Sequence, residues 1–181
     1  MNKFRFPYQD YILYILNKLE PERSDKIRLN KIAFFVEFAY ILKTQSELSS
    51  AQYAAISMGP VINSYDPILK QMEKAEKIKI DGNLVRPLEN PSTDVPEEIS
   101  ALIDPLIDKY SSLSNSELIN LSHATDSYKI TTSNEKKMGG IIDKDLAALE
   151  TFFEDNGVST GPIEESKLPK LTPSDLVEYR F

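Results

Sequence analysis

A single histidine and its neighbours are the residues of this chain best suited to acid–base chemistry. His123 lies beside Ser122 and close to Asp126, and these three residue types together can form a hydrolytic triad. Triads are assembled from distant segments, however, and the sequence has no Gly-x-Ser-x-Gly turn or glycine-rich oxyanion loop. We therefore expect a structural His123 that binds carbonyl oxygens at a helix end, where the helix dipole favours it.

Carboxylates offer a second kind of chemistry. Asp143, Asp145 and Glu150 are candidate ligands for magnesium or calcium, but the spacing of a calcium-binding loop is absent, and acidic residues at a helix start explain them more simply. Glu37 lies inside an apolar run, where burial without a partner would cost several kcal/mol or force protonation. We expect Glu37 to anchor a neighbouring backbone or basic group or to reach solvent, with catalysis as the alternative.

Composition excludes several functional classes. With no cysteine and one histidine, the chain cannot build a Cys or multi-His zinc site alone, and Met138-Gly139-Gly140 lacks the frame of a phosphate-binding loop. We predict no cofactor. The sequence has neither an apolar stretch long enough to span a bilayer nor the core of a secretion signal, so we expect a cytoplasmic protein.

The distribution of charge argues against general affinity for nucleic acid. The net charge is −7, and residues 81–181 carry nine Lys or Arg against nineteen Asp or Glu. Phosphate binding needs a concentrated basic face, which only the run Arg23, Lys26, Arg28 and Lys31 could supply. We interpret that run as the solvated start of a helix.

Hydrophobic periodicity predicts an α+β fold that is predominantly α-helical, with a central buried helix in a helical bundle and a small β-hairpin. The central helix begins after Ser24 or Asp25 and contains the densest apolar segment, Ile32 to Leu42. The other predicted elements are helices over Tyr8–Leu19, from Asn63 or Ser64 to Met72, from an Asp94/Glu97 capping box to Tyr110, from a Ser114/Glu117 capping box to Ser122, and from Ile142 or Asp143 to Phe153, and a hairpin over Ile78–Val85.

Two segments are less regular. Ser49 to Met58 fits either a short helix or a strand, and Gly59-Pro60-Val61 predicts a sharp bend after it. We expect one helical domain over residues 1–157, ended by Asn156-Gly157, and a C-terminal extension over residues 158–181. The extension is rich in apolar residues, so we expect it to dock on this chain or on another.

Three sequence blocks in order resemble the Panacea domain family, also called the SocA-like or phage-associated GepA-like domain. The blocks are Leu29–Glu37, Ser57–Ile62 and Glu117–His123. In this sequence the positions of the family motif are Lys31, Phe35, Glu37, Gly59, Pro60, Val61, Leu118, Ser122 and His123. Ile32-Ala33-Phe34-Phe35 stands where the family prefers Leu-Leu-Tyr, but the apolar volume is kept.

The resemblance implies an antitoxin that neutralises a protein toxin encoded beside it. An inhibitor of that kind needs no catalytic cluster, and the acidic C-terminal half would suit a basic toxin and speed the encounter. The alternative is a phage-derived regulatory or proteolytic-adaptor protein that binds a partner protein or DNA. A third reading is an enzyme centred on His123 or Glu37. The sequence leaves open the identity of the toxin and the oligomeric state.

Overall fold

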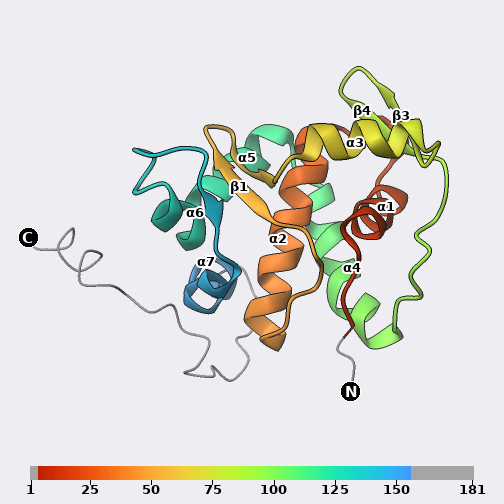
Figure 1. Cartoon of the computed structure of the whole chain (residues 1–181). Helices are drawn as coiled ribbons and strands as arrows, with labels where there is room; N and C mark the ends of the chain where they lie inside the picture. The colour runs from red at the N-terminus through yellow and green to blue at the C-terminus, as the bar shows by residue number, and fades with distance from the viewer. Residues whose placement is uncertain (1–3, 156–181) are drawn as a thin grey trace, which may run out of the picture.

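The computed structural model describes residues 4–155 and has one long helix, α2 (Lys26–Thr44), at its centre (Figure 1). Asp25 caps this helix by accepting a hydrogen bond from the Arg28 amide (2.9 Å), as predicted. Every residue from Arg28 to Leu42 is buried, because other elements cover α2 on nearly all sides. The central buried helix and the predominantly helical α+β class are therefore confirmed.

Helices α1 (Tyr8–Lys18), α4 (Glu97–Ser111) and α5 (Asn115–Ala124) pack against α2. The hydroxyls of Tyr11 on α1 and Tyr53 on β1 (Tyr53–Ile56) both donate to the carbonyl oxygen of Ala33, at 2.8 and 3.0 Å. One backbone atom of α2 thus holds two elements that lie on either side of α2 in the sequence. The predicted capping box of α5, formed by Ser114 and Glu117, is present.

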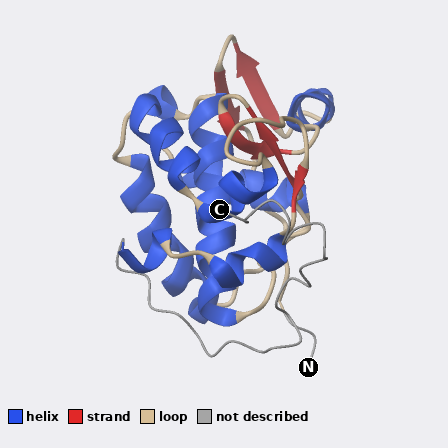
Figure 2. Cartoon of the chain, turned by 90° about the vertical axis from the view of Figure 1, so that its left-hand side faces the viewer, coloured by secondary structure: helices blue, strands red, loops and turns tan. Residues whose placement is uncertain are grey.

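Strand β1 is the middle strand of a three-stranded antiparallel sheet, between β2 (Gly59–Ile62) and β5 (Ile141–Ile142). Figure 2 shows the strands gathered on one side of the main helical layer. The turn between β1 and β2 is at Ser57-Met58. The predicted bend at Gly59-Pro60-Val61 is therefore wrong by two residues, because these residues are already paired with β1 as a strand.

The predicted hairpin is confirmed as β3 (Ile78–Asp81) and β4 (Leu84–Pro87), which pair in antiparallel register. Helix α3 (Tyr65–Lys74) follows β2 and precedes β3 in the chain. It buries Leu69 and Met72, which belong to the inner face predicted for this helix. A short 3₁₀ helix, η1 (Pro21–Arg23), follows α1. The structure thus has more β structure than the single hairpin expected.

Two helix predictions are wrong in detail. Helix α4 begins at Glu97 with Pro96 at its N-cap, and within residues 4–155 no side chain caps it, so Asp94 and Glu97 form no capping box. The helix expected from Asp143 is instead a 3₁₀ helix, η2 (Lys144–Leu149), followed by α7 (Phe152–Asp155). The preceding residues, Ile141 and Ile142, pair with β1.

Helix α6 (Asp126–Thr131) completes the described elements. The predicted stop at Asn156-Gly157, the domain limit there and the extension over residues 158–181 lie outside the described residues. Within residues 4–155, none of the helices has the length and hydropathy needed to cross a bilayer.

Candidate functional site

The three sequence blocks meet where α2, β2 and α5 touch one another. The ammonium group of Lys31, on α2, donates a hydrogen bond to the carbonyl oxygen of Pro60 on β2 (2.8 Å). Only 1% of Lys31 is exposed, and burial lowers the pKa of its side chain to about 7. Lys31 therefore fixes strand β2 to the central helix, although among the described residues no carboxylate balances its charge.

Gly59 lies between Lys31 and Ser122. Its φ angle is +89°, and a Cβ atom placed on it would lie 2.2 Å from the Ser122 hydroxyl and 3.2 Å from the Lys31 ammonium. The backbone angle and the lack of space both require glycine here. The Ser122 hydroxyl donates to the Ile119 carbonyl of its own helix (2.7 Å) and is buried, so it is not placed as a nucleophile.

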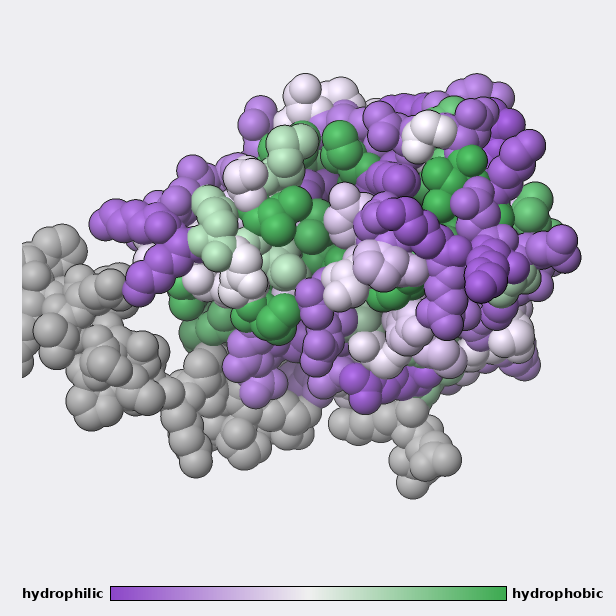
Figure 3. Space-filling model, turned by 45° about the horizontal axis from the view of Figure 1, so that its top comes forward, coloured by the Kyte–Doolittle hydropathy of each residue, from purple (hydrophilic) through white to green (hydrophobic). Residues whose placement is uncertain are grey.

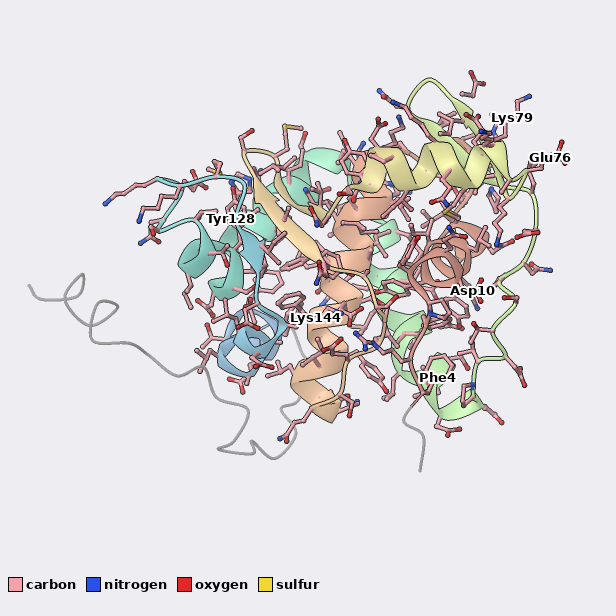
Figure 4. The ribbon with its side chains drawn as sticks, viewed as in Figure 1. Phe4, Asp10, Glu76, Lys79, Tyr128 and Lys144 are labelled. Atoms are coloured by element: carbon pink, nitrogen blue, oxygen red, sulfur yellow. The ribbon has the colours of Figure 1, made fainter. Side chains whose placement is uncertain are left out.

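Two residues outside the expected site complete the attachment of the β1–β2 hairpin. Asn30 accepts a hydrogen bond from the Ile62 amide (2.8 Å), and Tyr128 donates one to the Ile56 carbonyl (2.8 Å). Figure 4 shows Tyr128 reaching from α6 toward β1. The available signal for Asn30 was an asparagine inside the predicted central helix, just before its densest apolar segment, because a buried amide needs partners.

We name these contacts the Lys31 cluster, which consists of Asn30, Lys31, Gly59, Pro60, Ser122 and Tyr128. Its side chains bind the backbone at both strands of the hairpin. The remaining motif residues Phe35, Val61 and Leu118 are buried and apolar, and Phe35 stacks on Tyr110 with 4.4 Å between ring centroids. The three blocks therefore form a structural junction.

His123 does not bind the carbonyl oxygens at the end of α5, so that expectation is wrong. Its Nδ1 lies 2.7 Å from a carboxylate oxygen of Glu135, and its ring stacks on Tyr128 with 4.8 Å between centroids. Glu135 is close because the chain turns back after α6, which sequence spacing did not reveal. Asp126 accepts hydrogen bonds from the amide and hydroxyl of Thr151 instead of contacting His123. The triad is not assembled.

Glu37 is the centre of a second junction, farther along α2. Its carboxylate is fully buried and accepts hydrogen bonds from the amides of Leu48 (3.0 Å) and Ser49 (3.2 Å), from the Ser49 hydroxyl, and from the Lys144 ammonium (3.0 Å). Burial raises the pKa of this carboxyl group above its usual value, although Lys144 and Ser49 oppose the rise. We call these four residues the Glu37 cluster; Figure 4 shows Lys144 beside α2.

The anchoring role expected for Glu37 is thus present. The sequence did not reveal its basic partner, because Lys144 is more than one hundred residues away. Glu150 has a similar role: its buried carboxylate accepts hydrogen bonds from the amides of Asp126 and Ser127 at the start of α6. Asp143 caps η2 by binding the Asp145 amide. No group of His, Asp or Glu within residues 4–155 could hold a metal ion.

A hollow of about 360 Å³ lies beside the Glu37 cluster. Its charged lining residues are Arg5, Glu47, Asp143 and Lys144, and Glu47 pairs with both Arg5 and Lys144. The two cations are therefore neutralised by neighbouring carboxylates. His123 is not part of this lining, so His123 and Glu37 do not share it as a catalytic pair.

The basic run at the start of α2 does not form an exposed face. Arg28 and Lys31 are 4% and 1% exposed, which contradicts the prediction of a solvated helix start for these two residues. Arg28 donates to the Ser111 carbonyl (2.9 Å), and Arg23 donates to the Leu113 carbonyl (3.1 Å). These guanidinium groups hold the end of α4 and are not presented as a surface for phosphates.

Residues 29–129 match a family model described as antitoxin SocA-like, Panacea domain. The match covers 101 of the 181 residues and contains all three sequence blocks. Comparison with curated proteins and with solved structures gives no match.

Proposed function

The chain belongs to the family of SocA-like antitoxins with a Panacea domain, and on that premise we propose that it neutralises a cognate protein toxin in the cytoplasm by binding it directly. It acts without catalysing a reaction, as one half of a toxin–antitoxin system. An inhibitor can work in this way by covering the active site or the target-binding face of its toxin with an interface of about 1,200–2,000 Å².

The strongest support for this proposal is that the polar motif residues Lys31, Glu37 and Ser122 are buried and bonded within this chain. Lys31 and Glu37 are buried and hydrogen-bonded to the backbone of this chain, and the Ser122 hydroxyl is turned onto its own helix. A catalytic residue must be able to reach a reacting group. Motif residues used in this way fit a rigid scaffold for binding, and we propose that the family motif serves that purpose here.

The test is co-expression with the reading frame beside this one. Expression of that neighbour alone should stop growth, and expression of this chain with it should restore growth. The two purified proteins should form a complex at a fixed stoichiometry, measured by size-exclusion chromatography with light scattering.

A catalytic antitoxin would give a different result. Restored growth without a complex, together with a chemically altered toxin or toxin product, would contradict the proposal. His123→Ala and Glu37→Gln separate the two cases, because an enzyme centred on either residue would lose rescue although the variant is still folded.

A further inference from the structure

Within residues 4–155, no element fully covers one face of the three-stranded sheet. Ala54 on β1 pairs with Val61 on β2 and with Ile141 on β5, so these three side chains form a row across the sheet. Ile56 lies on the same face, and Met58 is in the turn at its end. We call Ala54, Ile56, Met58, Val61 and Ile141 the outer sheet face.

The outer sheet face is apolar, although it is partly open to solvent. Met58 and Ile141 are 45% and 49% exposed, Ala54 and Ile56 are half-buried, and Val61 on β2 is buried, so the open part of the face lies along β1, β5 and the hairpin turn. On the opposite face, Tyr53, Ala55 and Ile142 are at most 2% exposed and pack in the core. An antiparallel sheet with one buried face normally carries polar residues on the other. Figure 3 shows hydrophobic residues gathered beside hydrophilic ones on the face of the molecule that it views.

The Lys31 cluster holds this face rigidly before any partner binds. Lys31 and Asn30 attach β2 through Pro60 and Ile62, and Tyr128 attaches the end of β1 through Ile56. A surface that is already ordered loses less conformational entropy on binding. The hairpin that exposes Met58 at its tip is thus attached by buried polar groups.

Positive charge borders the outer sheet face at the hairpin tip. Lys136 and Lys137 are exposed and directly precede Met138, whose sulfur lies 3.8 Å from the Tyr128 hydroxyl. The amide of Gly139 then binds the Ala55 carbonyl (2.7 Å), which places this loop against the end of β1. The nearby carboxylate of Glu135 is engaged with His123. Two lysines against one carboxylate make the charge of this loop positive, although the chain as a whole carries −7.

We propose that the outer sheet face is the surface that binds the toxin, and that the toxin presents there an apolar segment flanked by acidic side chains. This inference rests on the proposed function and deepens it. Charges separated by more than about 8 Å are screened at physiological ionic strength. Lys136 and Lys137 therefore favour acidic side chains beside the hairpin tip, and the expectation of a basic toxin does not apply there. Beside Ile141, the hollow is lined by residues of both charges, Glu47 and Asp143 together with Arg5 and Lys144.

The first experiment measures binding of purified variants to the product of the neighbouring reading frame. Met58→Asp and Ile141→Asp should each raise the dissociation constant at least about tenfold, because each places a charge in an apolar contact. Leu88→Asp is the matched control: Leu88 is 58% exposed, follows the other hairpin, and should bind as wild type does. Circular dichroism confirms that each variant is folded.

Charge reversal tests the predicted acidic partner. The double variant Lys136→Glu/Lys137→Glu should slow association severalfold at low salt and weaken its salt dependence. Lys79→Glu on β3, far from Tyr128 in Figure 4, is the control and should leave the association rate unchanged. A faster association of the double variant would show a basic toxin segment and overturn that part of the proposal.

A crosslinking experiment identifies the occupant directly. Because the chain has no cysteine, Met58→Cys introduces its only thiol, which can carry a maleimide-linked benzophenone. Irradiation of the complex followed by mass spectrometry should give crosslinks to the toxin. Crosslinks to a second copy of this chain, or to its own residues 156–181, would overturn the proposal.

The two failures are distinguishable. If wild type forms no complex and restores no growth, the proposed function is wrong, and the toxin-binding surface is wrong with it. If wild type binds and rescues while Met58→Asp and Ile141→Asp are as active as Leu88→Asp, only the surface is wrong.

Discussion

The Lys31 and Glu37 clusters lie on the same helix, and they satisfy a buried charge in opposite ways. Glu37 has four hydrogen bonds, including one from the cation of Lys144, and these partners offset part of the cost of burial, which still raises its pKa. Lys31 has the Pro60 carbonyl, and burial lowers its pKa to about 7. A buried charge without a counter-charge lowers stability, whereas a fully bonded carboxylate mainly becomes costly when its partners are removed.

The difference between Glu37 and Lys31 indicates that buried polar groups serve two purposes in this core. The Glu37 cluster joins α2 to the segment after it and to η2, and it serves stability. The Lys31 cluster holds the hairpin that carries the outer sheet face, at some cost in folding free energy. Four predictions challenge or refine this contrast.

The largest effect is expected at Glu37. Glu37→Ala removes the acceptor for two buried amides and leaves the Lys144 ammonium unpaired, which should lower the free energy of unfolding by about 3–5 kcal/mol. Glu37→Gln keeps an acceptor oxygen and should cost clearly less. Urea denaturation measures both, and equal losses would show that the acceptor is unimportant.

Gly59→Ala should cost about 3 kcal/mol, the sum of a left-handed backbone angle and the contact with Ser122. Gly82→Ala is the matched control, because Gly82 also has a positive φ angle but no atom of the described part of the chain lies within 4 Å of the added carbon. The difference between the two variants isolates the steric part. Similar losses in both would mean that the junction tolerates the extra atom.

The third prediction concerns pH. The pKa of Lys31 is lowered from 10.5 to about 7 in the folded protein, so the unfolded chain binds one more proton between these values. Stability should therefore rise with pH by up to about 1.4 kcal/mol per unit in this window. Lys31→Met abolishes that contribution. Urea denaturation of wild type and of Lys31→Met between pH 7 and 9, below the range of tyrosine ionisation, gives the difference in their free energies of unfolding at each pH. A difference that does not change with pH would contradict the lowered pKa.

The smallest effect is expected at His123. His123→Phe keeps a ring that can stack on Tyr128 but loses the pair with Glu135, which is half exposed. Such pairs contribute about 0–1 kcal/mol, so thermal denaturation should change little. Growth rescue should persist as well. Loss of rescue by a stably folded His123→Phe variant would return His123 to the candidates for chemistry.

Helices and strands with a regular pattern of apolar residues, or with a capping residue close in the sequence, were predictable from the sequence. The uniformly apolar segment from Ile32 to Leu42 is the buried helix, and the Ser114/Glu117 capping box is present. Local signals also misled: Asp94 resembles a cap, yet Pro96 occupies the N-cap of α4. Arg28 and Lys31 were predicted to be exposed to solvent but are buried. The sequence does not show which backbone carbonyl groups the fold will bring within hydrogen-bonding distance of them.

The features of the candidate site that could not be predicted from the sequence depend on contacts between residues far apart in the chain. The pairing of Glu37 with Lys144, and of Ile141 with Ala54, depends on the return of the chain after α6. A strand of two residues has too little periodicity to be recognised. The outer sheet face therefore became visible only with the register of all three strands.

The two tyrosine hydroxyls on the Ala33 carbonyl bear on how the molecule opens. Tyr11 comes from the helix before α2 and Tyr53 from the strand after it, and both bonds are buried. Detachment of either segment breaks a buried hydrogen bond to Ala33 and exposes the apolar side chains that the segment buries, so local opening there is suppressed. In native-state hydrogen exchange, amides in the middle of α1, α2 and β1 should exchange with one common, global free energy, as a single cooperative unit.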